Sequence, residues 1–525
     1  MNRMDARRLP RSSAAMNAAC ACWVIAAGAF SASASPAEAV AAGAVTQVTA
    51  HAAPLVDAVR ARDSATALKL LKESPREAVR QLAVDGTTAL HWAVYNDDAE
   101  LVDRLVAAGA DVNARNDYGA TPLAQAAVVG NVRIIKRLLG AGADVESANA
   151  DGQTALMVLS RSSNVEAAKL LLKRGARVDA REAWRDQTAL MWAAAEGQPA
   201  MVALLIEYGA DVNARSRAND WERQVTAEPR NQARPAGGFT PLLYAARRGC
   251  AECARLLVTA GARVNDVDPE GVSPLLLATL NFSFDTAAFL IDQGADVNRW
   301  DIWGRAPLYA AVDMNTLPTG GRADRPSLDA TTGIELIDKL LKAGANPNMQ
   351  LKLFPPYRSL RDDRGADMML TIGTTPLIRA AKAGDVAAVR LLLAAGANVE
   401  LATINGITPL MAAAGNGSSG LDTRGRYKTE AQAVEVTQLL LAAGADANAR
   451  DRNGQTALHG AAGWGYNSLI RTLAAGRADL TAKDSQGRMA LDLTRASTTS
   501  SGREGARQAR PDTEALLREL MGAVK

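Results

Sequence analysis

The stretch TPLAQAAVVGNVRIIKRLLGAGADVESANADGQTALMVLS, residues 121–160, contains the pattern that decides the fold. Thr121 is followed 33 residues later by Thr154, and each threonine opens a segment whose apolar residues have helical spacing. Gly130 ends the first helical segment, and a second segment, 132–139, ends before Gly142. This stretch therefore predicts two short antiparallel helices followed by an extended turn.

The same pattern recurs along most of the 525 residues. Six of the ten intervals between successive landmarks are 33 residues long, and a glycine often follows 21 residues after each landmark. Two helices of this size cannot bury their own apolar face, so neighbouring units must stack. The sequence predicts an all-α solenoid of about 11–12 helix-turn-helix units. The landmarks are Thr88, Thr121, Thr154, Thr188, Thr240, Ser273, Ala306, Thr375, Thr408, Thr456 and Met489.

These motifs resemble the ankyrin repeat. The openings Thr88-Ala89-Leu90-His91 and Thr121-Pro122-Leu123 match the start of its first helix, and the Gly-Ala-Asp-Val-Asn turns that begin at Gly109 and Gly209 match its hairpin. The resemblance covers nearly everything from about residue 53 to 525. It is specific for the fold and implies that His91 and His459 hold their local turns by hydrogen bonds, but it says little about the partner. No catalytic motif is present, so we expect a non-enzymatic protein that binds other proteins.

Residues 1–39 have the pattern of an export signal. A basic start is followed by an apolar run over 14–30, and Ala37-Glu38-Ala39 fits a signal peptidase site. The apolar run is shorter than the roughly 20 residues that a spanning helix needs. We therefore expect a bacterial-type protein that is periplasmic or secreted and has no stable membrane insertion. A secreted effector that acts on host proteins is an alternative.

The remaining chain divides by its agreement with the repeat. We expect a linker over 40–52, an N-terminal capping repeat over 53–84 and ankyrin repeats over 85–495. A polar stretch over 496–510 predicts a disordered loop, and 511–525 predicts a final capping helix. Departures from the period predict insertions at about 216–236, 314–330, 349–371 and 416–430.

Composition excludes several classes of function. Lys plus Arg (59) and Asp plus Glu (56) nearly balance, and the formal net charge of +3 gives no reason to expect a nucleic-acid partner. Only three histidines and four cysteines are present, so we expect no metal or cofactor and no catalytic site. Cys250 and Cys253 form a C-x-x-C pair that leaves a thiol-redox protein as an alternative, although no thioredoxin-like pattern surrounds it.

We place the partner-binding site on the concave helix face and the hairpin edge, within about residues 215–371. Arg and Trp are the residues most enriched at binding hot spots, and this region is rich in both. The alternative for Trp300 and Trp303 is packing against the hairpin of the next repeat. We expect the protein to be a monomer. The predicted contact residues are Trp221, Arg247, Arg248, Trp300, Trp303, Phe354 and Tyr357.

A periodic basic pattern suggests a further surface. Arg115, Arg181, Arg215 and Arg450 each lie six residues after a turn glycine. At equal positions in a stack they would form a basic ladder along the hairpin tips. The alternative is that they are solvated side chains that keep this edge soluble.

Overall fold

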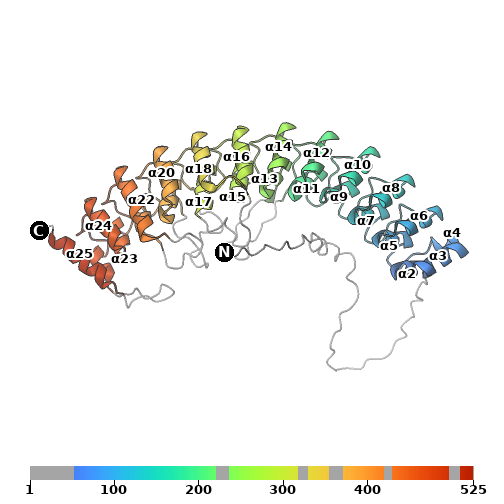
Figure 1. Cartoon of the computed structure of the whole chain (residues 1–525), viewed down its shortest axis with the longest axis horizontal. Helices are drawn as coiled ribbons and strands as arrows, with labels where there is room; N and C mark the ends of the chain where they lie inside the picture. The colour runs from blue at the N-terminus through green and yellow to red at the C-terminus, as the bar shows by residue number, and fades with distance from the viewer. Residues whose placement is uncertain are drawn as a thin grey trace, which may run out of the picture. The chain divides into compact units, whose positions relative to one another are not determined.

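The computed structural model describes residues 53–219, 236–316, 329–353, 371–418, 428–495 and 509–523. The chain forms two compact units, unit 1 up to Ala150 and unit 2 from Asp151 onward, and each is described by itself. Within both units, short helices follow one another in pairs, as Figure 1 shows. The predicted all-α repeat fold is confirmed.

Unit 1 contains three helix pairs in its described part, and the first of them carries an additional short helix, α4. Its helices are α2 (Pro54–Arg60), α3 (Ser64–Glu73), α4 (Pro75–Ala78), α5 (Ala89–Tyr95), α6 (Ala99–Ala107), α7 (Pro122–Val129) and α8 (Val132–Gly140).

Unit 2 continues the same pattern. The first helix of each pair lies on the inner side of its curved stack and the second on the outer side (Figure 1). Its elements are α9 (Ala155–Ser160), α10 (Val165–Lys173), α11 (Ala189–Glu196), α12 (Pro199–Glu207), β1 (Ala218–Asn219), β2 (Ala236–Gly237), α13 (Pro241–Arg248), α14 (Ala251–Thr259), α15 (Pro274–Leu280), α16 (Phe284–Asp292), α17 (Pro307–Asn315), α18 (Gly333–Lys342), α19 (Pro376–Ala383), α20 (Val386–Ala394), α21 (Pro409–Ala414), α22 (Glu430–Ala442), α23 (Ala457–Trp464), α24 (Asn467–Ala475), the 3-10 helix η2 (Ala490–Thr494) and α25 (Pro511–Ala523).

The landmark residues start the first helices for a clear physical reason. The Thr240 hydroxyl accepts a hydrogen bond from the backbone N–H of Leu243, and Pro241 occupies the first turn, where no N–H is needed. Gly249 ends the helix at a φ of 77°, in the left-handed region that glycine adopts without strain. The 33-residue period therefore repeats a start signal and a stop signal for the same short helix.

Small residues on the first helices let neighbouring units pack closely. Ala193 and Ala194 of α11 and Ala245 and Ala246 of α13 are fully buried. The leucines of the second helices, such as Leu205, complete the core between units. Burial of this kind stabilises a stack only through neighbouring units.

Asparagine side chains join successive hairpins. The Asn298 side-chain amide donates to the carbonyl oxygen of Gly344 at 3.0 Å, and its oxygen accepts from the backbone N–H of Asn346 at 2.7 Å. The pair of bonds satisfies a carbonyl and an N–H group of the following hairpin turn, which have no partner within a helix. The same arrangement recurs at Asn113, Asn213, Asn265, Asn348 and Asn448.

The first predicted insertion begins at a short antiparallel strand pair. Ala218 pairs with Gly237 and Asn219 with Ala236. The expected signal over 1–39, the linker over 40–52 and most of the disordered loop over 496–510 lie outside the described residues. So do the central parts of the four predicted insertions.

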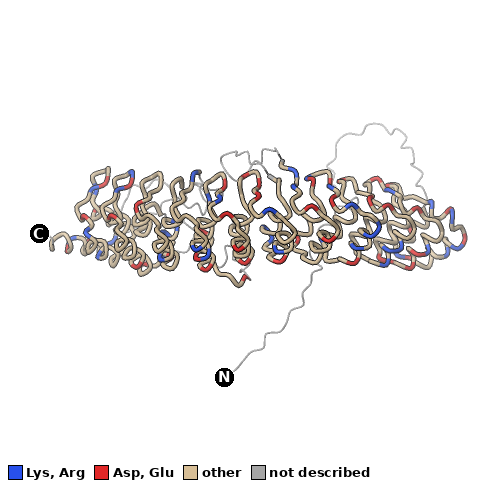
Figure 2. Tube along the Cα trace, turned by 90° about the horizontal axis from the view of Figure 1, so that it is seen from above, with Lys and Arg blue, Asp and Glu red and all other residues tan. Residues whose placement is uncertain are grey.

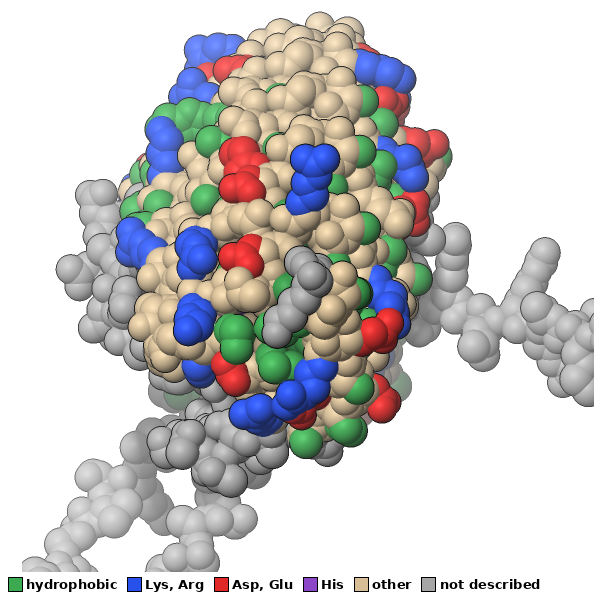
Figure 3. Space-filling view, turned by 90° about the vertical axis from the view of Figure 1, so that its left-hand side faces the viewer, with side chains coloured by type: hydrophobic (Ala, Val, Ile, Leu, Met, Phe, Trp, Pro, Cys, Tyr) green, Lys and Arg blue, Asp and Glu red, His purple; other side chains and the backbone are tan. Residues whose placement is uncertain are grey.

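Charges of both signs are distributed along the tube of each unit (Figure 2). In the space-filling view, lysines and arginines are interspersed with acidic side chains over the visible face (Figure 3). Among the described residues, none of the helices has the length and apolar character required to span a bilayer.

Candidate partner-binding surface

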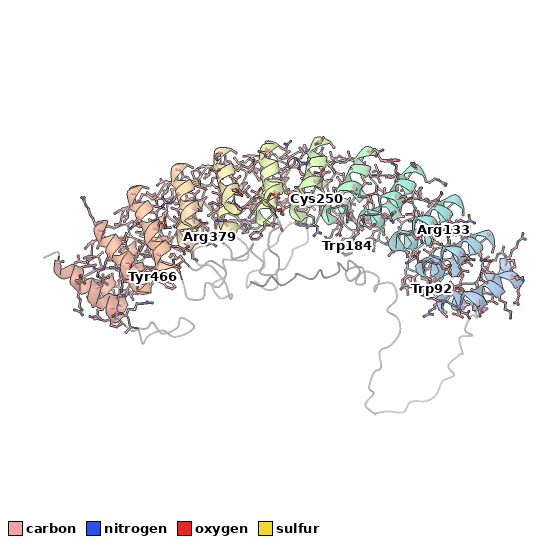
Figure 4. The ribbon with its side chains drawn as sticks, viewed as in Figure 1. Trp92, Arg133, Trp184, Cys250, Arg379 and Tyr466 are labelled. Atoms are coloured by element: carbon pink, nitrogen blue, oxygen red, sulfur yellow. A yellow bond between two sulfur atoms is a disulfide. The ribbon has the colours of Figure 1, made fainter. Side chains whose placement is uncertain are left out.

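The exposed apolar side chains of unit 2 gather on its hairpin turns. Trp184 is 59% exposed, and Figure 4 shows it at the inner edge of unit 2. The neighbouring repeats leave these side chains exposed in the described part of unit 2. Among the described residues of unit 2, the exposed large hydrophobic residues are Trp184, Trp300, Ile302, Leu353 and Ile404, and all five belong to these turns.

Two arginines at the C-terminal ends of first helices, Arg161 after α9 and Arg247 in α13, contact aromatic rings. The guanidinium of Arg161 is 5.2 Å from the ring centre of Trp192, in the next repeat. Arg247 lies over both Tyr244, at 5.1 Å, and Phe239, at 5.3 Å. Cation–π contacts of this kind hold a guanidinium in place. We call these five residues, Arg161, Trp192, Phe239, Tyr244 and Arg247, the arginine–aromatic row.

Hydrogen bonds fix the rings of the arginine–aromatic row. The Trp192 indole N–H donates to the side-chain oxygen of Gln187 at 3.1 Å, and the amide nitrogen of Gln187 donates to the Tyr244 hydroxyl at 2.5 Å. Phe239 packs edge-on against Tyr244, with ring centres 5.3 Å apart. The row is therefore one connected structure that extends from α9 to α13.

The predicted contact residues have different surroundings. Arg247 and Arg248 are exposed at the end of α13. Trp300 is 41% exposed, and the Lys352 ammonium lies 3.2 Å from its ring centre. Trp303 is only 3% exposed, so the structure contradicts its role in partner contact.

Trp303 is buried because the next hairpin covers it. Its carbonyl oxygen accepts hydrogen bonds from the backbone N–H groups of Lys352 and Leu353, and the Arg305 guanidinium lies 4.9 Å from its ring centre. This is the packing alternative considered for the tryptophan pair, and it holds for Trp303. The other predicted contact residues, Trp221, Phe354 and Tyr357, lie outside the described residues.

The periodic arginines form neither a free basic ladder nor a set of merely solvated side chains. Arg450 donates to the carbonyl oxygen of Lys483, in the next repeat, at 2.7 Å. Arg115, Arg181 and Arg215 make the equivalent bond to Ala148, Arg215 and Val267, at 2.8, 2.8 and 2.7 Å. Each arginine therefore joins its hairpin to the following one by a hydrogen bond.

The two histidines hold their local turns, as the family resemblance implies, and each also makes a hydrogen bond to the next repeat. The backbone N–H of Thr88 donates to Nδ1 of His91, so Nε2 carries the proton and donates to the carbonyl oxygen of Ala120 at 3.0 Å. His459 makes the same bonds with Thr456 and Arg488. Burial lowers the pKa of both imidazoles below its usual value of 6.5.

Cys250 and Cys253 form a disulfide at the start of α14 (Figure 4). Sγ of Cys250 also accepts a hydrogen bond from the Cys253 backbone N–H at 3.1 Å, in the place of an N-cap. Cys253 is fully buried. The sequence pattern did not predict that this pair would be bonded.

The carboxylate of Asp268, in a hairpin turn, lies in surroundings that disfavour its charged form. Burial raises the pKa of Asp268 to about 6, and the nearby Glu270 and Asp301 add to the effect. Its oxygen accepts from the backbone N–H groups of Glu270 and Val272 at 2.9 and 2.8 Å. The equivalent Asp301 has the Arg305 guanidinium at 2.7 Å, whereas Val272 occupies the corresponding position for Asp268.

Comparison with protein families agrees with this geometry. A model described as ankyrin repeats in three copies matches residues 55–149, 125–216, 223–301, 242–317 and 329–421. Two further models, for many copies and for the single ankyrin repeat, match 432–493 and 405–452. The chain belongs to the ankyrin-repeat family. Ankyrin-repeat proteins are in general non-enzymatic interaction scaffolds, and their repeats imply a protein partner.

No curated protein matches this ankyrin-repeat chain significantly. A solved structure, titled the crystal structure of the ankyrin repeat domain of Bcl-3, a unique member of the IκB protein family, is 26% identical to it. The match covers 43% of this chain and 94% of that one, with a TM-score of 0.36.

Two features of this ankyrin-repeat surface were missed from the sequence. Trp184 is the most exposed tryptophan among the described residues, and its position four residues before the landmark Thr188 could have marked it as a hairpin tip. Gln187 links two repeats through Trp192 and Tyr244, and no local pattern indicates such a contact.

Proposed function

We propose that this chain is an exported scaffold that binds a partner protein through the concave side and hairpin turns of unit 2. The contact zone extends over about residues 215–371, with Trp184 beside it. The chain acts there as a monomer, in the periplasm or outside the cell. No chemistry on the partner is proposed.

The observation that carries this proposal is the placement of exposed apolar side chains. The exposed large hydrophobic residues in the described part of unit 2 all lie on hairpin turns. Large exposed aromatic side chains such as Trp184 and Trp300 are candidate anchors for a partner protein, because tryptophan is enriched at binding hot spots. Arg247 and Arg248 are exposed at the C-terminal end of α13 and could pair with acidic groups of a partner.

Two independent features support export. The leader over 1–39 has a basic start, an apolar run and a small-residue cleavage site. The Cys250–Cys253 disulfide suits an oxidising compartment such as the periplasm. N-terminal sequencing of the protein from fractionated native cells tests export: a start near residue 35 or 40 supports it, and an intact Met1 in the cytosol contradicts it.

The binding proposal is tested by replacing residues 220–235 with an Asn-Gly turn. This retains the β1–β2 pair and Arg217, whose guanidinium binds the Asp186 carboxylate at 2.8 and 3.0 Å. We expect an unchanged melting temperature and at least tenfold weaker capture of the partner, equivalent to about 1.4 kcal/mol. Normal capture by a folded variant would show that this insertion does not contribute to binding.

A further inference from the structure

The arginine–aromatic row has the properties of a carboxylate-binding surface. A guanidinium in contact with an aromatic ring can still bind a carboxylate with two hydrogen bonds through its N–H groups. The ring contacts of Arg161 and Arg247 reduce the freedom these side chains would lose on binding. The row is thus arranged for anionic groups before any partner arrives.

Among the described residues around the arginine–aromatic row, the charged side chains without a close ion-pair partner are mainly arginines. Among the described residues, no carboxylate lies within ion-pair distance of Arg247 or Arg248. The Arg161 guanidinium has only a long contact, 3.6 Å, with Glu196. An incoming acidic side chain would therefore meet arginines that no carboxylate in the described ranges pairs closely.

The nearby acidic residues are already engaged. Asp186 holds Arg217, and the carboxylate of Glu182 accepts hydrogen bonds from the backbone N–H groups of Trp184, Arg185 and Gln187 at 2.7 to 3.0 Å. These carboxylates cannot neutralise the exposed arginines without breaking their own contacts. Charge complementarity consequently favours an acidic occupant.

Repeat geometry also fixes a spacing. Arg161 lies seven residues after Thr154, and Arg247 lies seven residues after Thr240, so they occupy the same repeat position two units apart. Stacked helices lie about 10 Å apart, which separates the two positions by roughly 20 Å. An extended chain rises about 3.3 Å per residue, so about six residues cover this distance.

We propose that the arginine–aromatic row binds an extended acidic segment of the partner protein, with carboxylates about six residues apart that contact Arg161 and the Arg247–Arg248 pair. This inference rests on the proposed function and names the chemistry of the partner. Glu196 occupies the Arg161 end until the segment displaces it. Trp184 lies on the hairpin that precedes α11, between the two arginines in the chain.

The test uses the full chain and a fluorescein-labelled, twelve-residue Gly/Ser peptide that carries two Glu pairs six residues apart. Fluorescence anisotropy at low salt should show binding that weakens as salt rises. We expect R247Q/R248Q to weaken binding at least tenfold and E196Q to strengthen it. A peptide with Lys in place of Glu should not bind.

Arg255 provides a matched control. It lies over Phe289 at 5.2 Å but belongs to the outer helix α14, where Glu252 pairs with it at 3.0 Å. R255Q should change the dissociation constant less than twofold. Absence of peptide binding by the wild type, equal binding by R247Q/R248Q, or tighter binding of a twelve-nucleotide oligothymidylate would each overturn the inference.

The inference and the proposed function fail separately. If R247Q/R248Q captures the native partner normally while the Asn-Gly replacement of 220–235 does not, the scaffold proposal stands and the acidic-segment proposal is wrong. If neither variant affects capture, both are wrong for this region. Equal melting temperatures of the variants and the wild type establish that the fold is intact.

Discussion

Replacement of Asp268 by Asn should stabilise the protein at neutral pH. The carboxylate is largely buried, and burial raises its pKa from 3.8 to about 6. An asparagine oxygen can accept the same two backbone hydrogen bonds without carrying a charge. Unit 1 contains a natural example, because Asn116 accepts from the N–H groups of Tyr118 and Ala120 at the equivalent position.

The expected gain in the free energy of unfolding follows from the shift in the pKa of Asp268. Each pH unit between the folded and unfolded values corresponds to about 1.4 kcal/mol, so the ionised carboxylate costs the fold roughly 2–3 kcal/mol before solvent screening. Because Asp268 is partly exposed, we expect D268N to gain about 1–2 kcal/mol at pH 7.5. The folded state holds its proton more tightly than the unfolded state. The gain should therefore be complete above pH 6 and disappear as the pH falls toward 3.8.

Urea unfolding at pH 7.5, 6 and 4 measures this difference between D268N and the wild type. Amide hydrogen exchange of residues 268–305 locates the effect, since unfolding of a repeat array need not be two-state. D301N is the matched control: the same substitution at the same turn position should destabilise, because it removes the buried partner of Arg305. A D268N variant that is no more stable at pH 7.5 than at pH 4, relative to the wild type, would refute the reasoning.

Three further predictions concern contacts between repeats. R450M removes the bond to the Lys483 carbonyl, so residues 451–495 should exchange amide hydrogens faster and lose about 1 kcal/mol, whereas R452M, at an exposed neighbouring position, should have no effect. Burial lowers the pKa of His459 in the folded state, so the free energy of unfolding should fall as the pH drops below about 6.5. The stability advantage of the wild type over H459N should shrink in the same pH range, and a pH-independent difference between them would contradict this. Reduction of the Cys250–Cys253 disulfide should cost about 2 kcal/mol from its short loop, measured as a lower urea midpoint in the wild type but not in C250S/C253S.

The fold could be predicted because its determinants are local and repeated. Thr240 starts a helix, Pro241 fills its first turn and Gly249 ends it, and the same signals recur at a fixed period. The buried alanine pairs, such as Ala245 and Ala246, are also visible in the sequence. The periodic arginines are visible as well, but the sequence does not reveal the carbonyl that each one binds. Equal spacing in a stack places each guanidinium beside an equivalent carbonyl of the next repeat.

The site was only partly predictable because its contacts join distant residues. Trp300 and Trp303 lie three residues apart in one turn, yet only Trp303 is covered, by backbone contacts from Lys352 and Leu353. Arg161 reaches a ring in the following repeat, Trp192, and no spacing rule in the sequence selects that ring. Such pairings depend on how hairpins of successive repeats overlap, which the repeat period leaves open.

The most direct test of the binding surface is photo-crosslinking from opposite sides of unit 2. A benzoylphenylalanine replaces either Trp184, on an inner hairpin tip, or Phe289, on the outer helix α16, in the full chain within its native cell extract. We predict that one specific protein is crosslinked from position 184 and not from position 289. Crosslinking of that protein from position 289 alone would place the partner on the outer side and contradict the account.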